Sequence, residues 1–353
     1  IRTMPQLGED IYRAIGRLPG ISGGDFSARF NVRGGDHDQV LVTLDGLELQ
    51  EPFHLKDIAG GALSIVDLEV VGGVDLMTGG FPADYGDRQS AVLDMESRTP
   101  GPGRRISAGV GLTNIRVLAE GGTGDMDWLL SARRGYIDFV LKLMQEEYTP
   151  SPDYYDLFGR LTFGSGSRHR FGLNVLWASD RLHFTAEEGD YRFDSAYGIA
   201  YSWFTWDVMY GSRLHVRSLP YIGRSSQDRD GETRFEPDDF RYGHSEPLGI
   251  NEMVDDERHT TVYGLKTDWK MEAGSRHLAR FGFDLRGFRA TYDYMNRRRG
   301  RLRLGPPIHV GHDTIRATPE PQGWQVGLYV SDKWQVAGPP MVDLGLRYDL
   351  QSH

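Results

Sequence analysis

Cysteine is absent from the 353 residues, which excludes a disulfide framework and a thiolate metal site. Apolar residues are also scarce: they make up 39% of the chain, where roughly 45–50% is usual for a soluble domain once glycine is counted. No run approaches the roughly 18 apolar residues of a membrane-spanning helix. A transmembrane barrel strand stays possible, because it needs only about 9–11 residues with one apolar face. The net charge of −10 argues against nucleic acid as a partner, since phosphates need a basic face.

Glycine and aromatic residues are abundant instead, with 45 glycines and an aromatic fraction of 11%. The stretch Ile65–Arg98 reads as two short strands around the glycine-rich turn Gly79–Pro82, because glycine and proline allow turn angles that β-branched residues cannot take. This stretch separates two architectures, a small mixed region before it and a long series of hairpins after it.

The region before this boundary is expected to be mixed α and β. Residues 1–18 predict one helix, in which Ile11, Ile15 and Leu18 share a face. Glu9 and Asp10 suit its first turn, and Pro19-Gly20 ends it. A strand at Val40–Leu44 is followed by the turn Asp45-Gly46. His37 stands among polar residues but has no second ligand at a recognised spacing, so a loop position is favoured over a metal site.

After Arg104 the chain alternates apolar and polar residues in about ten segments, the pattern of half-buried strands. These are Ile106–Leu112, Trp128–Ala132, Leu157–Phe163, Phe171–Trp177, Tyr197–Trp203, Leu214–Val216, Tyr263–Trp269, Ala279–Leu285, Val326–Val330 and Val342–Tyr348.

Short and long connections alternate between these segments. The short ones are Gly121–Asp125, Gly164–Ser167, Asp207–Gly211, Glu272–Ser275 and Ala337–Pro340, and the long polar ones are 135–153, 182–195, 223–257 and 292–321. A transmembrane antiparallel up-and-down β-barrel has this asymmetry, with short turns at one end and long loops at the other. Closure of such a barrel also removes free strand edges.

The two faces of the strands fit the same interpretation. The polar face is expected to line the lumen, because a charge on a lipid face costs roughly 2–4 kcal/mol at mid-membrane; its members include Asn174, Asp284, Arg286, Ser331 and Lys333. Tryptophans near strand ends could form interfacial girdles or fill the core of a soluble barrel; they are Trp128, Trp177, Trp203, Trp269 and Trp334. The basic run Arg297–Arg301 is predicted in a loop, either solvated or in contact with an anion or lipopolysaccharide.

Several stretches, in this order and spacing, resemble the TonB-dependent outer-membrane receptors. They are Val32–Gly35, Val40–Leu47, Asp75–Gly80, Tyr85-Gly86, Leu328–Trp334 and Gly345–Asp349. The resemblance implies a mostly β chain: a small α+β plug domain at about 1–100, then 101–353 as the first part of the barrel, about ten of 22 strands. The stretch Gly79–Gly86 with Arg88 and Ser90 resembles a subgroup that often carries an upstream carboxypeptidase-regulatory-like domain. On this reading the chain is a piece of a longer protein, with that domain and the TonB box before Ile1.

The resemblance also implies a function and a set of residues. The function is active uptake of a scarce ligand across the outer membrane, driven by the TonB–ExbB–ExbD complex; the ligand could be a ferric siderophore, a glycan, cobalamin or a peptide. Gln50, Phe53 and His54 would contact the ligand from the plug's apical loop, or simply pack against the wall. Arg33 would make a plug–barrel contact, while Thr78 stands where the family commonly has arginine, which puts the usual ion-pair lock in doubt on that side.

The resemblance implies no enzyme, catalytic residue, cofactor or metal, and partners limited to TonB–ExbB–ExbD, outer-membrane lipid with lipopolysaccharide, and the ligand. Two alternatives stay open. An outer-membrane barrel enzyme could use Asp190, His183 and His244, although these have no recognisable arrangement. A passive porin or adhesion barrel is the other. Neither alternative accounts for the first 100 residues, since such barrels have no plug.

Overall fold

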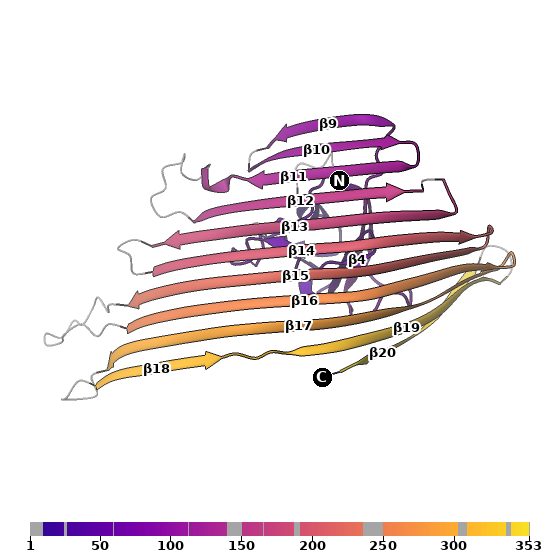
Figure 1. Ribbon diagram of the computed structural model, residues 1–353. Helices are drawn as coiled ribbons and strands as arrows, with labels where there is room; N and C mark the ends of the chain where they lie inside the picture. Colours follow the sequence, from indigo (N-terminus) through magenta and orange to yellow (C-terminus); the bar gives the residue numbers. More distant parts are fainter. Residues whose placement is uncertain are drawn as a thin grey trace.

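A large curved antiparallel sheet of long strands dominates the protein, and the N-terminal elements lie against one of its faces (Figure 1). The computed structural model describes residues 10–24, 27–58, 60–111, 113–139, 150–164, 166–186, 191–235, 250–302, 309–336 and 340–352. We call the N-terminal part through Ser97 the plug and the large sheet the wall. No helix in these ranges has the length and apolar character to cross a membrane.

The plug is built around a four-stranded sheet in the order β4-β3-β8-β7, in which β3 and β8 are parallel. Two small antiparallel pairs, β1–β2 and β5–β6, lie beside it. The elements are α1 (Ile11–Ile15), β1 (Ile21–Gly23), β2 (Phe30–Val32), η2 (His37–Gln39), β3 (Val40–Leu44), β4 (Leu47–Glu48), β5 (Phe53–His54), β6 (Leu63–Ser64), β7 (Val71–Met77) and β8 (Ala91–Ser97).

The predicted N-terminal helix is shorter than expected within the described residues. It spans Ile11–Ile15, and Asp10 caps it by accepting from the backbone N–H groups of Tyr12 and Arg13. Ile11 and Ile15 are buried as predicted, but Leu18 lies in the exposed turn that follows Gly16. Residues 1–9 of the prediction, Glu9 included, lie outside the described residues.

The strands predicted around the boundary are confirmed. β7 and β8 form an antiparallel pair across the glycine-rich turn, although the first strand starts only at Val71. β3 occupies Val40–Leu44 and turns into β4 through Asp45 and Gly46, whose φ angles are 50° and 89°. Such left-handed angles suit glycine and, among other residues, aspartate best.

The wall runs in chain order from β9 to β20, which are its two edges. Its strands are β9 (Gly103–Val110), β10 (Asn114–Thr123), β11 (Met126–Gly135), β12 (Ser151–Phe163), β13 (His169–Thr185), β14 (Tyr191–Tyr210), β15 (Leu214–Phe235), β16 (Ile250–Ala273), β17 (His277–Leu302), β18 (His309–Ala317), β19 (Gln322–Gln335) and β20 (Met341–Gln351). The mostly β, up-and-down architecture is confirmed, as part of a barrel. β10 was not among the predicted segments, because Gly121 and Gly122 interrupt its alternation.

The prediction of long loops was largely wrong. β15, β16 and β17 continue through most of 223–257 and 292–302, and Arg297–Arg299 pair with β16 inside β17 instead of lying in a loop. The alternation of apolar and polar residues fades there because both faces of the strands are polar, whereas the backbone hydrogen bonds between the strands continue unchanged. The short connections between successive strand pairs are confirmed where described, and we call that end of the wall the turn end and the opposite one the far end.

β18 and β19 are two pieces of one neighbour of β17. β18 pairs with Tyr294–Leu302 and β19 with His277–Arg289. Between the two pieces, the carbonyls of Pro319 and Pro321 accept from the N–H groups of Tyr292 and Ala290. Because proline has no N–H to donate, these two prolines join the backbone hydrogen-bond ladder only through their carbonyl oxygens.

The two faces of the wall differ as predicted, with one exception. Asn174 and Ser331 are buried in the interior, and Leu173 and Leu328 are exposed on the outer face. On β14 the inner face is itself aromatic: Trp203 is 1% exposed and packs against Phe158, with ring centroids 6.3 Å apart. Trp203 is therefore not part of an interfacial girdle, and it belongs to the hydrophobic core that plug and wall share.

Candidate functional site

The plug contacts the wall at the pair β5–β6. We call this pair, together with its connection and residues 50–52, the apical hairpin. His54 of β5 is 0% exposed. Its Nδ1 lies 3.1 Å from Oδ2 of Asp180 on β13, and its Nε2 contacts Oδ1 of Asp156 on β12. The ring of Tyr154 covers the imidazole with centroids 4.7 Å apart.

Both ring nitrogens of His54 face carboxylate oxygens, so both must donate. Only the protonated imidazolium has two N–H donors. Burial lowers the pKa of His54, but the carboxylates of Asp156 and Asp180 outweigh burial and raise this pKa to about 9. The side chain is therefore charged at neutral pH.

Arg133 of β11 completes this cluster. Its Nε donates to Oδ2 of Asp156 at 2.5 Å, and its Nη2 donates to the carbonyl oxygen of Ser64 on β6 at 2.5 Å. Asp156 thus binds one strand of the hairpin directly through His54 and the other through Arg133.

The other predicted ligand residues lie near His54 but differ in exposure. Gln50 is exposed, and its backbone N–H donates to Oη of Tyr201 at 3.0 Å. Phe53 is buried beside Tyr12, with ring centroids 5.3 Å apart. Contact of these residues and of His54 with a ligand stays a prediction.

Arg33 adopts a left-handed backbone with φ 50°, and its guanidinium lies next to Gly79 of the plug itself. Its predicted contact with the barrel therefore stays a prediction. Sequence reasoning missed another plug–wall ion pair: Glu48 of β4 accepts from Arg286 of β17 and, at 2.9 Å, from Arg88.

Ion pairs of this kind recur along the plug–wall contact. Arg98, the residue after β8, binds Glu120 of β10 at 2.5 Å, and Asp67 of the plug lies 3.4 Å from Arg116 of the same strand. Pairing signals of this type are invisible in a single sequence, because the partners are dozens to hundreds of residues apart.

The segment Tyr85-Gly86 contacts the last wall strand. Arg347 of β20 passes over Gly86, where a Cβ atom would lie 2.3 Å from its Nε. Its Nη1 donates to the carbonyl oxygens of Ala83 and Asp84 at 3.4 and 3.3 Å. A side chain at position 86 would have to displace this guanidinium.

Neutralising Glu48 should weaken the plug–wall contact. We expect Glu48→Gln to lower the stability of the docked plug by about 1–3 kcal/mol, because Arg286 and Arg88 lose a charged acceptor in a partly buried site. The measurement is the urea midpoint at which a cysteine at Val92, buried in β8, becomes reactive to a maleimide. The matched control is Glu257→Gln on the exposed outer face, expected within about 0.5 kcal/mol of the parent; equal shifts for both would contradict the assignment.

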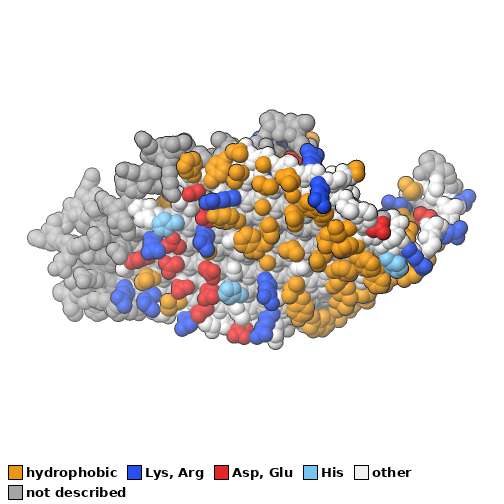
Figure 2. Space-filling view, turned by 45° about the horizontal axis from the view of Figure 1, so that its top comes forward, with side chains coloured by type: hydrophobic (Ala, Val, Ile, Leu, Met, Phe, Trp, Pro, Cys, Tyr) orange, Lys and Arg blue, Asp and Glu red, His pale blue; other side chains and the backbone are white. Residues whose placement is uncertain are grey.

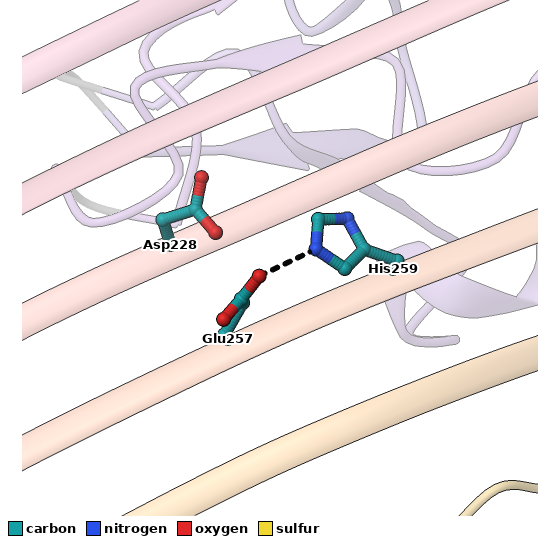
Figure 3. A group of neighbouring side chains, drawn as sticks. All are labelled: Asp228, Glu257 and His259. Carbon is teal, nitrogen blue, oxygen red and sulfur yellow. Dashed lines mark hydrogen bonds and ion pairs between the residues drawn. The ribbon is translucent and has the colours of Figure 1, made fainter.

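Residues proposed for an enzymatic site do not converge where they are described. His183 pairs with Asp194 on the exposed surface, while Asp190 and His244 lie outside the described residues. On the outer face of β15 and β16, Asp228, Glu257 and His259 approach one another within 4.8 Å (Figure 3). All three are exposed, and His259 already pairs with Glu257 at 2.8 Å, as in an ordinary surface ion pair.

Residues 4–92 match the family model of the TonB-dependent Receptor Plug Domain. The chain resembles a TonB-dependent receptor. No curated protein matches it, but solved structures with the same fold do, and the chain spans about half of their length.

Three of these structures illustrate the receptor fold. The ferric citrate transporter FecA in its unliganded form is 13% identical, with TM-score 0.64, over 97% of this chain and 53% of that one. The outer membrane transporter YddB from Escherichia coli is 10% identical, with TM-score 0.64, over 97% and 54%. The siderophore receptor PiuA from Acinetobacter baumannii is 13% identical, with TM-score 0.62, over 95% and 53%.

Proposed function

We propose that the protein acts in TonB-dependent active uptake of a scarce ligand across the outer membrane. The observation that carries the proposal is a plug of the TonB-dependent type docked on a barrel wall by buried ion pairs. A passive pore has no use for such a plug, and an enzyme would need convergent catalytic groups. The domains are proposed to be residues 1–100 and 101–353.

The outer face of the wall supports a membrane location. Hydrophobic side chains gather in a belt over the turn-end part of the strands, and charged side chains gather toward the far end (Figure 2). Lipid would cover the belt, and lipid headgroups with lipopolysaccharide would meet the charged zone above it. The turn end would then face the periplasm.

The ligand is proposed to arrive from the far end and to meet the apical hairpin. Gln50 is exposed and would be contacted first, whereas Phe53 and His54 are buried and would be reached only if the hairpin moved. Structures of the same fold are named as a ferric citrate transporter, a siderophore receptor and a peptide importer, and the ligand proposed here is a ferric siderophore, a peptide, a glycan or cobalamin. Arg33 is proposed to contact the barrel when the plug moves.

Movement of the plug is proposed to need the TonB–ExbB–ExbD complex, because many buried hydrogen bonds and ion pairs must break together. A polar cavity of about 400 Å³ separates part of the plug sheet from the wall near the turn end, and Asp94, Arg160 and Lys266 are among its lining residues. This space would let the plug rearrange without leaving the wall entirely.

Uptake of the ligand should depend wholly on TonB, while ligand binding should not. In cells that express the full-length gene, loss of TonB should reduce accumulation of a radiolabelled candidate ligand to background and leave surface binding unchanged. Ferric siderophores and short peptides would be screened first. Accumulation that persists without TonB would show a passive pore or another mechanism.

A further inference from the structure

The apical hairpin is fastened to the wall by a buried group of four charges. Two are cations, His54 and Arg133, and two are carboxylates, Asp156 and Asp180. Each residue is at most 6% exposed. The group is neutral as a whole only when His54 carries its proton.

Loss of that proton would leave the cluster unbalanced. Asp156 keeps Arg133 as a partner, but Asp180 binds only His54 among the described residues, and its second oxygen is buried without a hydrogen-bond partner. A neutral imidazole also has only one donor for two carboxylates. An uncompensated buried carboxylate is strongly unfavourable, so either the proton is retained or the contact opens.

Among the described residues, the other groups around this cluster supply no unpaired cation to replace the imidazolium. Tyr154 stacks on the imidazole and is itself covered by the Arg133 guanidinium, 5.3 Å from the ring centroid. Within the plug, Asp10 accepts from the backbone N–H of Ser64 at 2.6 Å, and Asp67 lies near Arg133. Asp10 adds negative charge, and Asp67 is paired with Arg116 of β10 at 3.4 Å, so that arginine is not available to Asp180.

Elsewhere the apical hairpin is held by weaker contacts. Lys56 lies 5.3 Å from the ring centroid of Tyr197, and Asp57 is 3.7 Å from Arg229. The plug sheet, by contrast, belongs through Leu93 and Met95 to the main core, which it shares with the wall and with Phe53, and its Glu48 pairs with Arg286 of the wall. Leu55, Ala62 and Leu63 of the hairpin pack with Tyr154 in a smaller cluster outside that core. The part of the hairpin that contains Leu55, Ala62 and Leu63 is therefore the part expected to detach while the sheet stays docked.

We propose that His54 is a proton-operated clasp: its imidazolium holds the apical hairpin on β12 and β13, and deprotonation releases the hairpin from the wall. The clasp would regulate access to the surface that the proposed function assigns to the ligand. It stands on the contacts alone, so its test needs neither a ligand nor TonB, and its failure would leave the uptake proposal untouched.

The sign of the pH dependence follows from the direction of the shift. The pKa of His54 is raised from 6.5 to about 9, because its carboxylate partners outweigh desolvation. A raised pKa means that the clasp is complete below about pH 6.5 and is lost as pH rises through about 9. Opening should become roughly tenfold easier for each pH unit in this window.

The test uses the full chain in membrane vesicles with one introduced cysteine at a time, since the chain has none. A cysteine at Ala62, buried in the hairpin beside Leu63, reports opening of the hairpin; a cysteine at Val92, buried in β8, reports opening of the plug sheet. We divide the maleimide labelling rate at Ala62 by the rate at Val92, because this ratio is largely free of the pH dependence of thiol reactivity itself. We expect this ratio to rise by about one hundredfold between pH 6.5 and 9.

Two variants separate a clasp from simple packing. His54→Gln cannot titrate, so its labelling ratio should be high and flat across the same pH range. Asp180→Asn removes one carboxylate but leaves Arg133 and Asp156 paired, so the midpoint of the rise should move to lower pH. Any of three results would overturn the proposal. The labelling ratio of the parent could stay constant with pH, it could rise equally in His54→Gln, or the midpoint of the rise could stay in place in Asp180→Asn.

Discussion

Asp156→Asn should destabilise the docked apical hairpin by about 3–5 kcal/mol, the cost of removing one partner from a buried ion pair. Asp156 is shared by Arg133 and His54, and both cations would lose their common carboxylate in a region that water does not reach. The measurement is the urea midpoint for labelling of a cysteine at Ala62 in the apical hairpin, combined with loss of hydrogen-exchange protection in β5 and β6.

The matched control for this substitution is Asp343→Asn on β20. Asp343 pairs with Lys333 at 3.8 Å on the exposed surface, and such pairs contribute about 0–1 kcal/mol. The double variant Asp156→Asn with His54→Gln should be less destabilised than the sum of the single variants, because removal of the imidazolium relieves one unpaired charge. Strict additivity would show that His54 and Asp156 do not act together.

Leu173→Arg should cost about 2–4 kcal/mol of barrel stability in a bilayer, because it places a charge on the outer face in the middle of the apolar belt. Leu173 is 47% exposed there and alternates with the buried residues Gly172 and Asn174. The same face of the same strand carries Thr185 near the far end, and Thr185→Arg should be nearly neutral. Folding yield into lipid vesicles, followed by the heat-modifiable mobility of a folded barrel on gels, measures both.

Equal folding of the two arginine variants in vesicles would mean that no lipid covers the belt. The wall would then belong to a soluble assembly, and the proposed location in the outer membrane would be lost. The docked plug and its ion pairs would be unaffected by that outcome.

The strands of the wall were predictable where one face is apolar and the other polar. Phe171–Trp177 is such a segment, and its odd-numbered residues are exposed on the outer face. Alternation gives no signal beyond the belt, where both faces of β16 and β17 are charged. For that reason Arg297–Arg299 were expected in a loop although they lie in a continuous ladder.

The contacts between plug and wall were predictable only in part. The segment containing His54 was identified as an important part of the plug, but its partners Asp156 and Asp180 follow it by 102 and 126 residues. Nothing local marks an aspartate on an inner strand face as the partner of a particular histidine. Pairing across such distances is set by the register of strands that a single sequence does not specify.

The length of the central strands has a consequence for how the protein would meet its surroundings. β17 has 26 residues, which at about 3.3 Å per residue and a tilt of about 40° rise about 65 Å. An apolar band of about 25 Å leaves roughly 40 Å of hydrogen-bonded sheet standing clear of it. Bulky solutes, antibodies or phage would therefore meet a stiff extension of the sheet beyond the membrane, and insertions within its strands would break the hydrogen bonds that hold it together.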